Sequence, residues 1–294
     1  MVLCWFLENL LYLKCKKIQP DENIYTGVSV MAMKLSTGLT TRNVALMAIF
    51  AALYFVLSLI TPYVPAIGVP EIKISLEALI ATLFGLILGP YLGALAAFLG
   101  ALIGFIYTGM LPSNLPFLFS PPLNALVSGL IFYKKWKWGF VIFAALIVAF
   151  LVTPPVQPLT ENWLIAVAVL FDKVIALLLI LPLVKFAKQF SVGKAAAFFF
   201  ILAFVGNEVD NMWGSFIFAT PIVYGSPFFG GLTVDVVRGL FLISPFAYPA
   251  IRLIQAFIAM LIAVPLMQTL KGTPWLWKKD NILSSNQPEK QPLS

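Results

Sequence analysis

The sequence is built around eight apolar runs whose lengths approach what is needed to cross a lipid bilayer. They cover residues 44–60, 74–88, 91–108, 118–132, 139–152, 164–184, 195–219 and 246–270. A helix needs about 20 apolar residues to cross the hydrocarbon core, and fewer when it is short or enclosed by its neighbours. The runs 118–132 and 139–152 are short and flank a basic stretch. The pattern therefore predicts an all-α, polytopic membrane helix bundle with about six to eight transmembrane helices.

The composition indicates that lipid is the main solvent of this chain, and it excludes several kinds of catalytic and metal site. Of the 294 residues, 61% are hydrophobic and 11% are charged, and the mean hydropathy is +0.97. Soluble domains are about 45–50% apolar and about 25% charged. The chain has no histidine and only two cysteines, which excludes His-based acid–base catalysis and His-ligated or four-Cys metal sites. We therefore expect a multi-pass protein of the cell membrane that is not an enzyme and holds no cofactor or metal.

The few basic residues alternate from loop to loop as the positive-inside rule requires. With the N-terminus placed inside, the inside segments hold most of them and the outside segments hold two, accompanied by acidic residues. This asymmetry predicts an even number of spans with both termini cytoplasmic. The inside set is Lys34, Arg42, Lys134, Lys135, Lys137, Lys185, Lys188, Lys194, Lys271, Lys278 and Lys279, and the outside set is Lys73 and Arg238.

The two ends of the chain differ from the apolar middle. Residues 1–33 form an N-terminal extension in which the lysines follow a short apolar stretch, unlike a secretory signal. This extension is either an interfacial helix or sequence upstream of the real start. Residues 34–272 form the predicted transmembrane substrate-binding domain. Residues 273–294 are polar and rich in Pro, Ser and Gln, which predicts a disordered cytoplasmic tail.

The densest polar cluster inside an apolar run lies at residues 206–214. Its candidate substrate-binding residues are Asn207, Glu208, Asp210, Asn211 and Trp213. On a helix, Asn207, Asp210 and Asn211 share one stripe, while Glu208 is offset and Trp213 lies one turn from Asp210. Charge in the membrane is costly unless it is paired or hydrated, so such a stripe beside an aromatic ring favours a small, polar, partly planar ligand.

Other polar residues are expected to converge on the same outer half of the bundle. Asp172, inside the sixth run, and Arg252, in the last run, are added to the predicted substrate-binding set. The alternative is structural: the carboxylates of the cluster form ion pairs with Arg252 or Arg238. The sequence is compatible with both substrate binding and structural ion pairs.

No segment of the chain resembles an ATPase. Gly193 and Lys194 lack the preceding glycine and the following Ser or Thr of a phosphate-binding loop. Energy for any transport must come from an ion gradient or from a separate subunit.

Four segments together are similar to a known family. These are an Arg before an Ala-rich first helix (residues 41–53), a Pro-rich outside loop (65–75), a Gly-Pro turn before a Gly-rich helix (89–94), and the final helix (252–267). They resemble the substrate-binding (S) component of energy-coupling factor (ECF) vitamin transporters. The likeness covers about residues 40–135 and 245–270, and the family usually has six spans.

The resemblance implies a substrate-capture subunit that binds a vitamin or related micronutrient from outside. It would dock onto a transmembrane coupling subunit that carries two ATPases. The family's docking ridge maps onto Ala48 and Ala52, its lid onto the first outside loop, and its ligand contacts onto the region of Asn207 to Trp213. The alternative is a self-contained, proton-coupled secondary transporter in which Asp172, Glu208 or Asp210 carries the proton.

Overall fold

The computed structural model describes residues 41–60, 63–66, 69–75, 78–188, 194–243, 245–271, 273, 275 and 276. The chain divides into two units, Met1–Arg42 and Asn43–Ser294, and the architecture below is that of the second. The predictions for the extension 1–33 and for nearly all of the tail 273–294 lie outside the described residues. The domain boundaries inferred from the sequence remain predictions.

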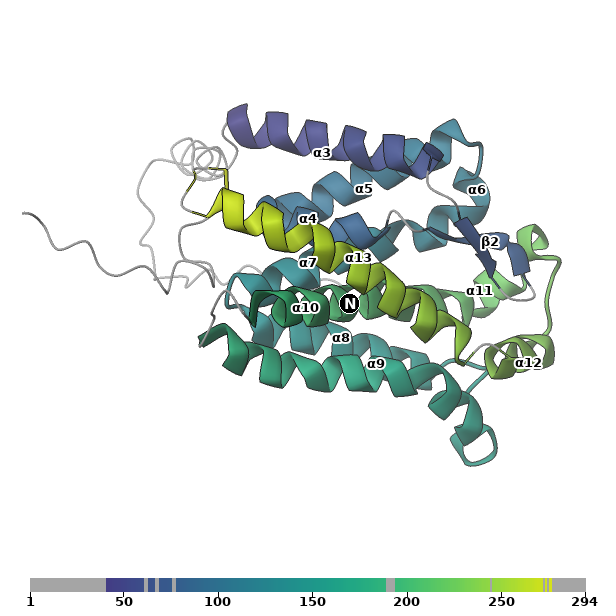
Figure 1. Ribbon diagram of the computed structural model, residues 1–294. Helices are drawn as coiled ribbons and strands as arrows, with labels where there is room; N and C mark the ends of the chain where they lie inside the picture. Colours follow the sequence, from purple (N-terminus) through teal and green to yellow (C-terminus); the bar gives the residue numbers. More distant parts are fainter. Residues whose placement is uncertain are drawn as a thin grey trace, which may run out of the picture. The chain divides into compact units, whose positions relative to one another are not determined.

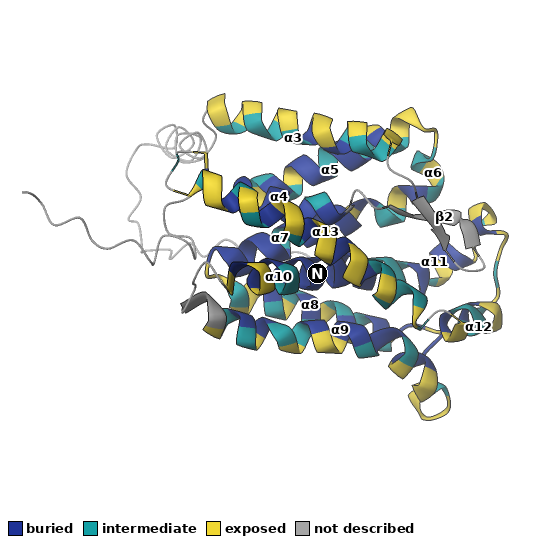
Figure 2. Ribbon diagram, viewed as in Figure 1, coloured by how far each residue is buried: buried dark blue, intermediate teal, exposed yellow. Residues whose placement is uncertain are grey.

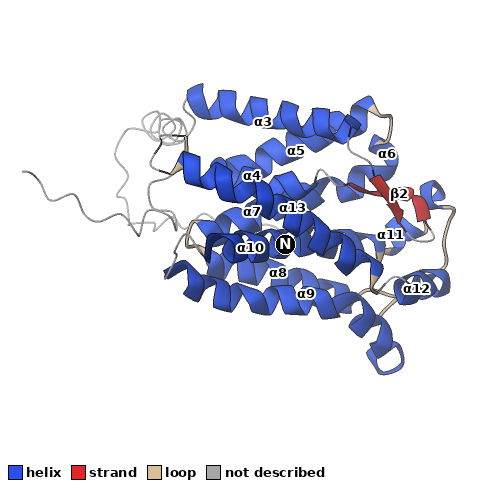
Figure 3. Cartoon of the chain, viewed as in Figure 1, coloured by secondary structure: helices blue, strands red, loops and turns tan. Residues whose placement is uncertain are grey.

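The described residues form helices almost throughout, which confirms the predicted all-α bundle (Figure 3). Figure 1 shows the helices running alongside one another, with β2, α6, α11 and α12 together at one end. The elements are α3 (Thr41–Ile60), β1 (Tyr63–Ala66), β2 (Val69–Ser75), α4 (Ala78–Ile87), α5 (Pro90–Tyr107), α6 (Leu111–Asn114), η1 (Leu115–Phe119), α7 (Ser120–Phe132), α8 (Trp136–Leu151), α9 (Leu159–Lys188), α10 (Ala195–Phe218), α11 (Pro221–Tyr224), η3 (Pro227–Phe229), α12 (Val234–Ile243) and α13 (Ala247–Leu270).

Among the described residues, six helical segments are long and apolar enough to cross a membrane. They are α3, α5, the continuous segment Leu111–Phe132, α9, α10 and α13. Two more apolar helices are shorter: α8 has 16 residues and α4 has 10. At 1.5 Å per residue, α4 spans about 15 Å, roughly half of a hydrocarbon core. The predicted range of six to eight spans is therefore explained by six long helices and two short ones.

The second apolar run begins as a strand instead of a helix. Residues 71–75 alternate polar and apolar side chains, which is the period of a strand. They belong to β2, which pairs antiparallel with β1 in a two-stranded hairpin. The helix of this run starts only at Ala78. The first outside loop, expected to act as a lid or as a simple connector, thus contains a hairpin.

Close backbone contacts hold α4, α5 and α7 together. A Cβ atom on Gly85 would collide with the Ala125 carbonyl, and one on Gly129 would lie 2.7 Å from the Pro90 Cα. In lipid, helices associate through this kind of close packing rather than through a hydrophobic driving force. The glycines of these helices are therefore needed where the backbones approach.

Helix α10 is the buried centre of the bundle, and α3 is its most exposed long helix (Figure 2). Helix α10 packs against α7, α9 and α13. The outward faces of the long helices carry exposed apolar side chains such as Val56 on α3, Leu178 on α9 and Phe257 on α13. An apolar exterior around a buried helix that bears polar groups is the arrangement of a membrane protein.

Candidate functional site

The polar cluster of α10 divides its contacts among three sets of neighbouring helices. Asn207, Glu208, Asp210 and Asn211 are all buried, in a helix that is otherwise largely apolar. Asn207 contacts α7, Asp210 contacts α13, and Glu208 contacts α9. The predicted site is thus not one uniform stripe, because residues two positions apart on a helix point to opposite sides.

On the α7 side, amides and hydroxyls form an uncharged network. The Asn124 side-chain amide donates a hydrogen bond to Asn207 Oδ1 at 3.0 Å. The Asn124 oxygen in turn accepts hydrogen bonds from Thr82 at 2.8 Å and Ser128 at 3.2 Å. Gly206 leaves room for these groups, since a Cβ there would lie against Asn124 and Ser128. The sequence did not reveal Thr82 or Ser128, because single hydroxyls in apolar helices are common.

On the α13 side, Asp210 forms a buried ion pair. Its Oδ1 lies 3.1 Å from Arg252 Nη2, and Arg252 also donates a hydrogen bond to Gln255 at 2.9 Å. The ion pair named as the structural alternative is thus present between Asp210 and Arg252, and their role in substrate binding stays a prediction. Arg238, the other suggested partner, instead pairs with Asp235 at 2.9 Å, away from the cluster.

On the α9 side, two carboxylates share one ammonium group. Lys173 Nζ lies 2.9 Å from Asp172 Oδ2 and 3.7 Å from Glu208 Oε2. Asn211 donates a hydrogen bond to the same Glu208 oxygen at 3.3 Å. The structure thus joins the predicted Asp172 and Glu208 through Lys173. The sequence showed Lys173 beside Asp172, but not that its ammonium group reaches across to α10.

Three buried polar atoms of the cluster have no hydrogen-bond partner within the part of the chain that the structure describes. They are Asn207 Nδ2, Glu208 Oε1 and Asp210 Oδ2. A buried polar atom without a partner costs about 1–3 kcal/mol, and more when it carries charge. Such atoms are rare in folded proteins and commonly indicate a missing ligand, water or ion.

Aromatic rings and open space flank the C-terminal end of the cluster on α10. The Trp213 indole donates a hydrogen bond to the Pro116 carbonyl at 3.0 Å, and its ring lies 5.9 Å from that of Phe119 and 6.0 Å from that of Phe216. A Cβ on Gly214 would meet no atom within 4 Å. The sequence predicted Trp213, but the contribution of Phe119 depends on how η1 folds back onto α10.

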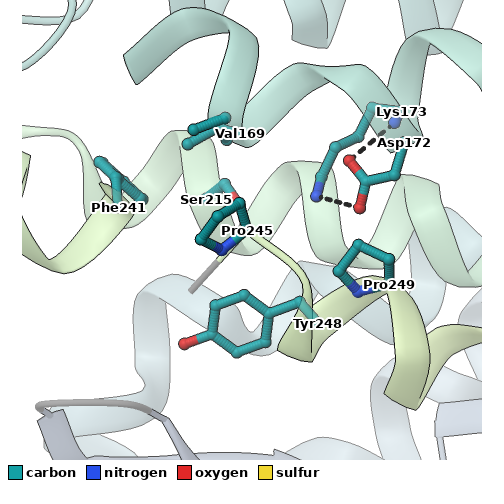
Figure 4. A pocket seen from close by; sticks show the side chains of 9 residues that line it. Val169, Asp172, Lys173, Ser215, Phe241, Pro245, Tyr248 and Pro249 are labelled. Carbon is teal, nitrogen blue, oxygen red and sulfur yellow. Dashed lines mark hydrogen bonds and ion pairs between the residues drawn. The ribbon is translucent and has the colours of Figure 1, made fainter. Parts of the chain in front are cut away.

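A small pocket lies on the α9 side, between α9, the C-terminal part of α10, α12 and the start of α13 (Figure 4). Figure 4 shows the paired Asp172 and Lys173 side chains at its edge, with Tyr248 across from them. The ring of Tyr248 and the hydroxyl of Ser215 were not among the predicted site residues. The lining residues are Ala168, Val169, Asp172, Lys173, Ser215, Phe241, Pro245, Tyr248 and Pro249.

Comparison with known families identifies what kind of protein carries this cluster. A family model described as the ECF-type riboflavin transporter, S component, matches residues 38–226, more than half of the chain. The chain belongs to this family. The S component family is part of a membrane transport system, as the sequence predicted. Comparisons with curated proteins and with solved structures gave no match.

The family match contains only part of the site of this S component. It includes α10 and its polar cluster, and it ends before α12 and α13. The matched segment therefore excludes Arg252 and the pocket residues contributed by α12 and by the region where α13 begins, which are Phe241, Pro245, Tyr248 and Pro249.

The predicted docking residues of this S component are exposed on the face of α3 that points away from the bundle. Ala48 and Ala52 are exposed, whereas Ala51 and Tyr54, on the side of α3 that faces the bundle, are buried. A Cβ on Gly100 of α5 would lie 2.6 Å from the Tyr54 Cβ, so this face is packed tightly. The ridge of Ala48 and Ala52 is available for contact with lipid or another protein.

Proposed function

We propose that this chain is the substrate-capture subunit of an ECF-type importer and that its substrate is riboflavin or a close flavin relative. The family match supports the class of protein and the type of substrate. The observation that carries the proposal is a pair of buried α10 atoms that have no partner among the described residues: an amide donor on Asn207, which packs towards α7, and a carboxylate acceptor on Asp210, which packs towards α13. The two residues are three positions apart and share one helix face.

This donor and acceptor complement one edge of a flavin ring. The pyrimidine part of the ring presents an N–H group next to a carbonyl oxygen. In the proposed complex, Asp210 Oδ2 accepts the ring N–H and Asn207 Nδ2 donates to the neighbouring carbonyl. The binding would satisfy two buried groups that are unpaired in the described structure. A site with unpaired polar groups discriminates strongly against ligands that cannot complete its hydrogen bonds.

The outer turn of α10 offers a place for the planar ring. Trp213 and Phe119 form an aromatic wall, and the space beside Gly214 is open. Gly214 lies four residues beyond Asp210, and thus one turn further out on the same face. A flat aromatic ligand that stacks on Trp213 would reach down to Asp210 with its polar edge.

The remaining predicted substrate-binding residues have supporting roles in this proposal. Arg252 fixes one oxygen of Asp210, which leaves the other oxygen for the ligand. Asn211 holds Glu208, and Asp172 holds Lys173. We propose that Asp172 and Glu208 maintain the charge network behind the flavin, on the α9 side of the same helix.

A ligand variant tests the flavin site without altering the protein. Titration of the purified chain with riboflavin, followed by flavin fluorescence, should show saturable binding. Methylation of the ring N–H (N3) should lower the affinity by about 10- to 150-fold, because a hydrogen bond to a charged group is worth about 1.5–3 kcal/mol. Lumiflavin, which keeps this ring edge and lacks the ribityl chain, is the matched control. Equal affinity for riboflavin and its N3-methyl derivative would refute the pairing with Asp210.

We also propose that Ala48 and Ala52 dock this subunit onto a transmembrane coupling subunit with two ATPases. Ala48→Trp places a large ring on the exposed ridge and should abolish flavin uptake by the assembled transporter while leaving flavin binding intact. Ala145→Trp, at an exposed alanine of α8, is the matched control and should leave uptake unchanged. Normal uptake with Ala48→Trp would remove the ridge from the interface.

A self-contained, proton-coupled carrier is the second candidate. The buried carboxylates on the α9 side are the observation that favours it. Vesicles that contain this chain alone distinguish the two functions. Flavin accumulation driven by a proton gradient without ATP would support the carrier and contradict the ECF proposal.

A further inference from the structure

The α9 side of the cluster contains one more negative charge than positive. Two carboxylates, on Asp172 and Glu208, face one ammonium group, on Lys173. All three side chains are at least 96% buried. By contrast, Asp210 and Arg252 on the α13 side cancel each other. An uncompensated charge in a buried site is strongly unfavourable, so the α9 side needs one further positive charge.

No described neighbour supplies that charge by direct contact. The guanidinium of Arg252, on α13, is bonded to Asp210 and Gln255. Helices α4 and α7 contain no charged residue, and their contribution to the cluster is uncharged. The charged residue within α8 is Lys137, which is exposed in the first turn. Tyr248, which lines the adjacent pocket, is neutral when protonated.

The two carboxyl groups differ in how their oxygens are satisfied. Asp172 Oδ1 accepts a hydrogen bond from the backbone N–H of Lys173 at 2.9 Å, and Oδ2 accepts one from Lys173 Nζ at 2.9 Å. Glu208 Oε2 accepts from Asn211 at 3.3 Å and lies 3.7 Å from Lys173 Nζ. Glu208 Oε1 has no partner among the described residues, although the side chain is fully buried. The unsatisfied charge therefore resides on Glu208.

We propose that Glu208 binds a proton on Oε1 in the folded protein. The proton makes the group of Asp172, Lys173 and Glu208 electrically neutral, and it removes the cost of a bare carboxylate oxygen in the bundle. A metal ion fits less well, because Lys173 already occupies the cationic position between the carboxylates. The described residues also contain no group of three or more His, Cys, Asp or Glu side chains suited to a metal.

The small pocket borders two of the three members of this group. It is lined by Asp172 and Lys173 and bordered by the ends of α12 and α13 (Figure 4). Ser215, also in its wall, lies seven residues beyond Glu208, which places both on one side of α10. The proton site is therefore distinct from the proposed flavin face, and it does not depend on the identity of the substrate.

Infrared spectroscopy tests the proposal on the full chain in detergent without any added substrate. A protonated carboxyl has a C=O stretching band separate from that of a carboxylate. We expect the band at neutral pH in the wild type and in Asp235→Asn, which changes an exposed carboxylate, and its loss in Glu208→Gln. Absence of the band in the wild type, or its persistence in Glu208→Gln, would overturn the proposal.

The pH dependence of stability gives a second readout. If the folded state holds a proton that the unfolded chain releases, raising the pH destabilises the fold. The wild type should therefore lose thermal stability towards alkaline pH more steeply than Glu208→Gln, whose amide cannot release a proton. Parallel pH profiles for the two proteins would contradict a proton on Glu208. Because neither readout involves flavin, a negative result would leave the proposed function standing, and failure to bind flavin would leave the proton site standing.

Discussion

The two sides of α10 carry similar residues under opposite electrostatic conditions. On the α13 side, Asp210 faces a guanidinium at 3.1 Å, and the charges balance. On the α9 side, Glu208 shares a single ammonium with Asp172 and is 3.7 Å from it. Two carboxylates two positions apart in one helix thus have different partners, because their side chains leave the helix in opposite directions. The partners on neighbouring helices therefore decide whether the charge of each buried carboxylate is balanced.

The largest effect should come from removing the cation on the balanced side. Arg252→Leu leaves Asp210 buried and unpaired, which should lower the free energy of unfolding by about 3–5 kcal/mol. Thermal unfolding in detergent measures this loss. The double variant Arg252→Leu with Asp210→Leu removes both charges and should recover most of the stability. A single variant as stable as the wild type would show that the ion pair does not balance this side.

Isosteric amide substitutions sharpen the contrast between the two carboxylates. Asp210→Asn removes a charged hydrogen-bond partner from Arg252 and should cost about 1.5–3 kcal/mol. Glu208→Gln resembles the protonated acid and should change the stability at neutral pH by less than about 1 kcal/mol. Both values come from thermal unfolding at the same pH. Equal losses in the two variants would mean that the sides do not differ in charge balance.

A third comparison assigns the flavin to one side. Gly214→Leu fills the open space on the α13 side and should lower riboflavin affinity by about tenfold, since overpacking a site typically costs 1–3 kcal/mol. Ser215→Val, on the adjacent position of the α9 side, should leave the affinity within about twofold. Fluorescence titration of the two variants measures both effects. If Ser215→Val has the larger effect, the substrate lies in the α9-side pocket instead.

The smallest predicted effect concerns the aromatic wall. Trp213→Phe keeps a ring for stacking but loses the indole hydrogen bond to the Pro116 carbonyl. We expect riboflavin affinity to fall by about two- to tenfold, the equivalent of one ordinary hydrogen bond. Trp163→Phe, at an exposed tryptophan of α9, should not change the affinity. An unchanged affinity in Trp213→Phe would show that this ring is not oriented by its indole group.

The sequence predicted the fold and the family because both depend on long, repeated signals. The apolar runs predicted the membrane helices, and the motifs of residues 41–94 indicated the S component. The β1–β2 hairpin was missed because the Pro-rich segment up to Lys73 was taken as a loop and Ile74 and Ser75 as the start of an apolar run, despite the alternation of residues 71–75. The same error in the boundary made the helix of this run appear longer in the sequence than α4, which has 10 residues.

The composition of the candidate site was only partly predictable. The residues of the α10 cluster stand out by polarity alone, and Asp172 and Arg252 were found for the same reason. Their division into two sides depends on which helices surround α10, and a single sequence does not specify those neighbours. Thr82, Ser128 and Phe119 come from separate helices and become recognisable only once packing brings them to α10.

The identity of the bound molecule tests the central claim most directly. Mass spectrometry of the small molecule released by denaturing the purified protein would identify it. The account predicts a flavin, with an N–H and a carbonyl side by side on its ring for Asp210 and Asn207. A released ligand that lacks this edge, or binding of such a compound in preference to riboflavin, would contradict the account.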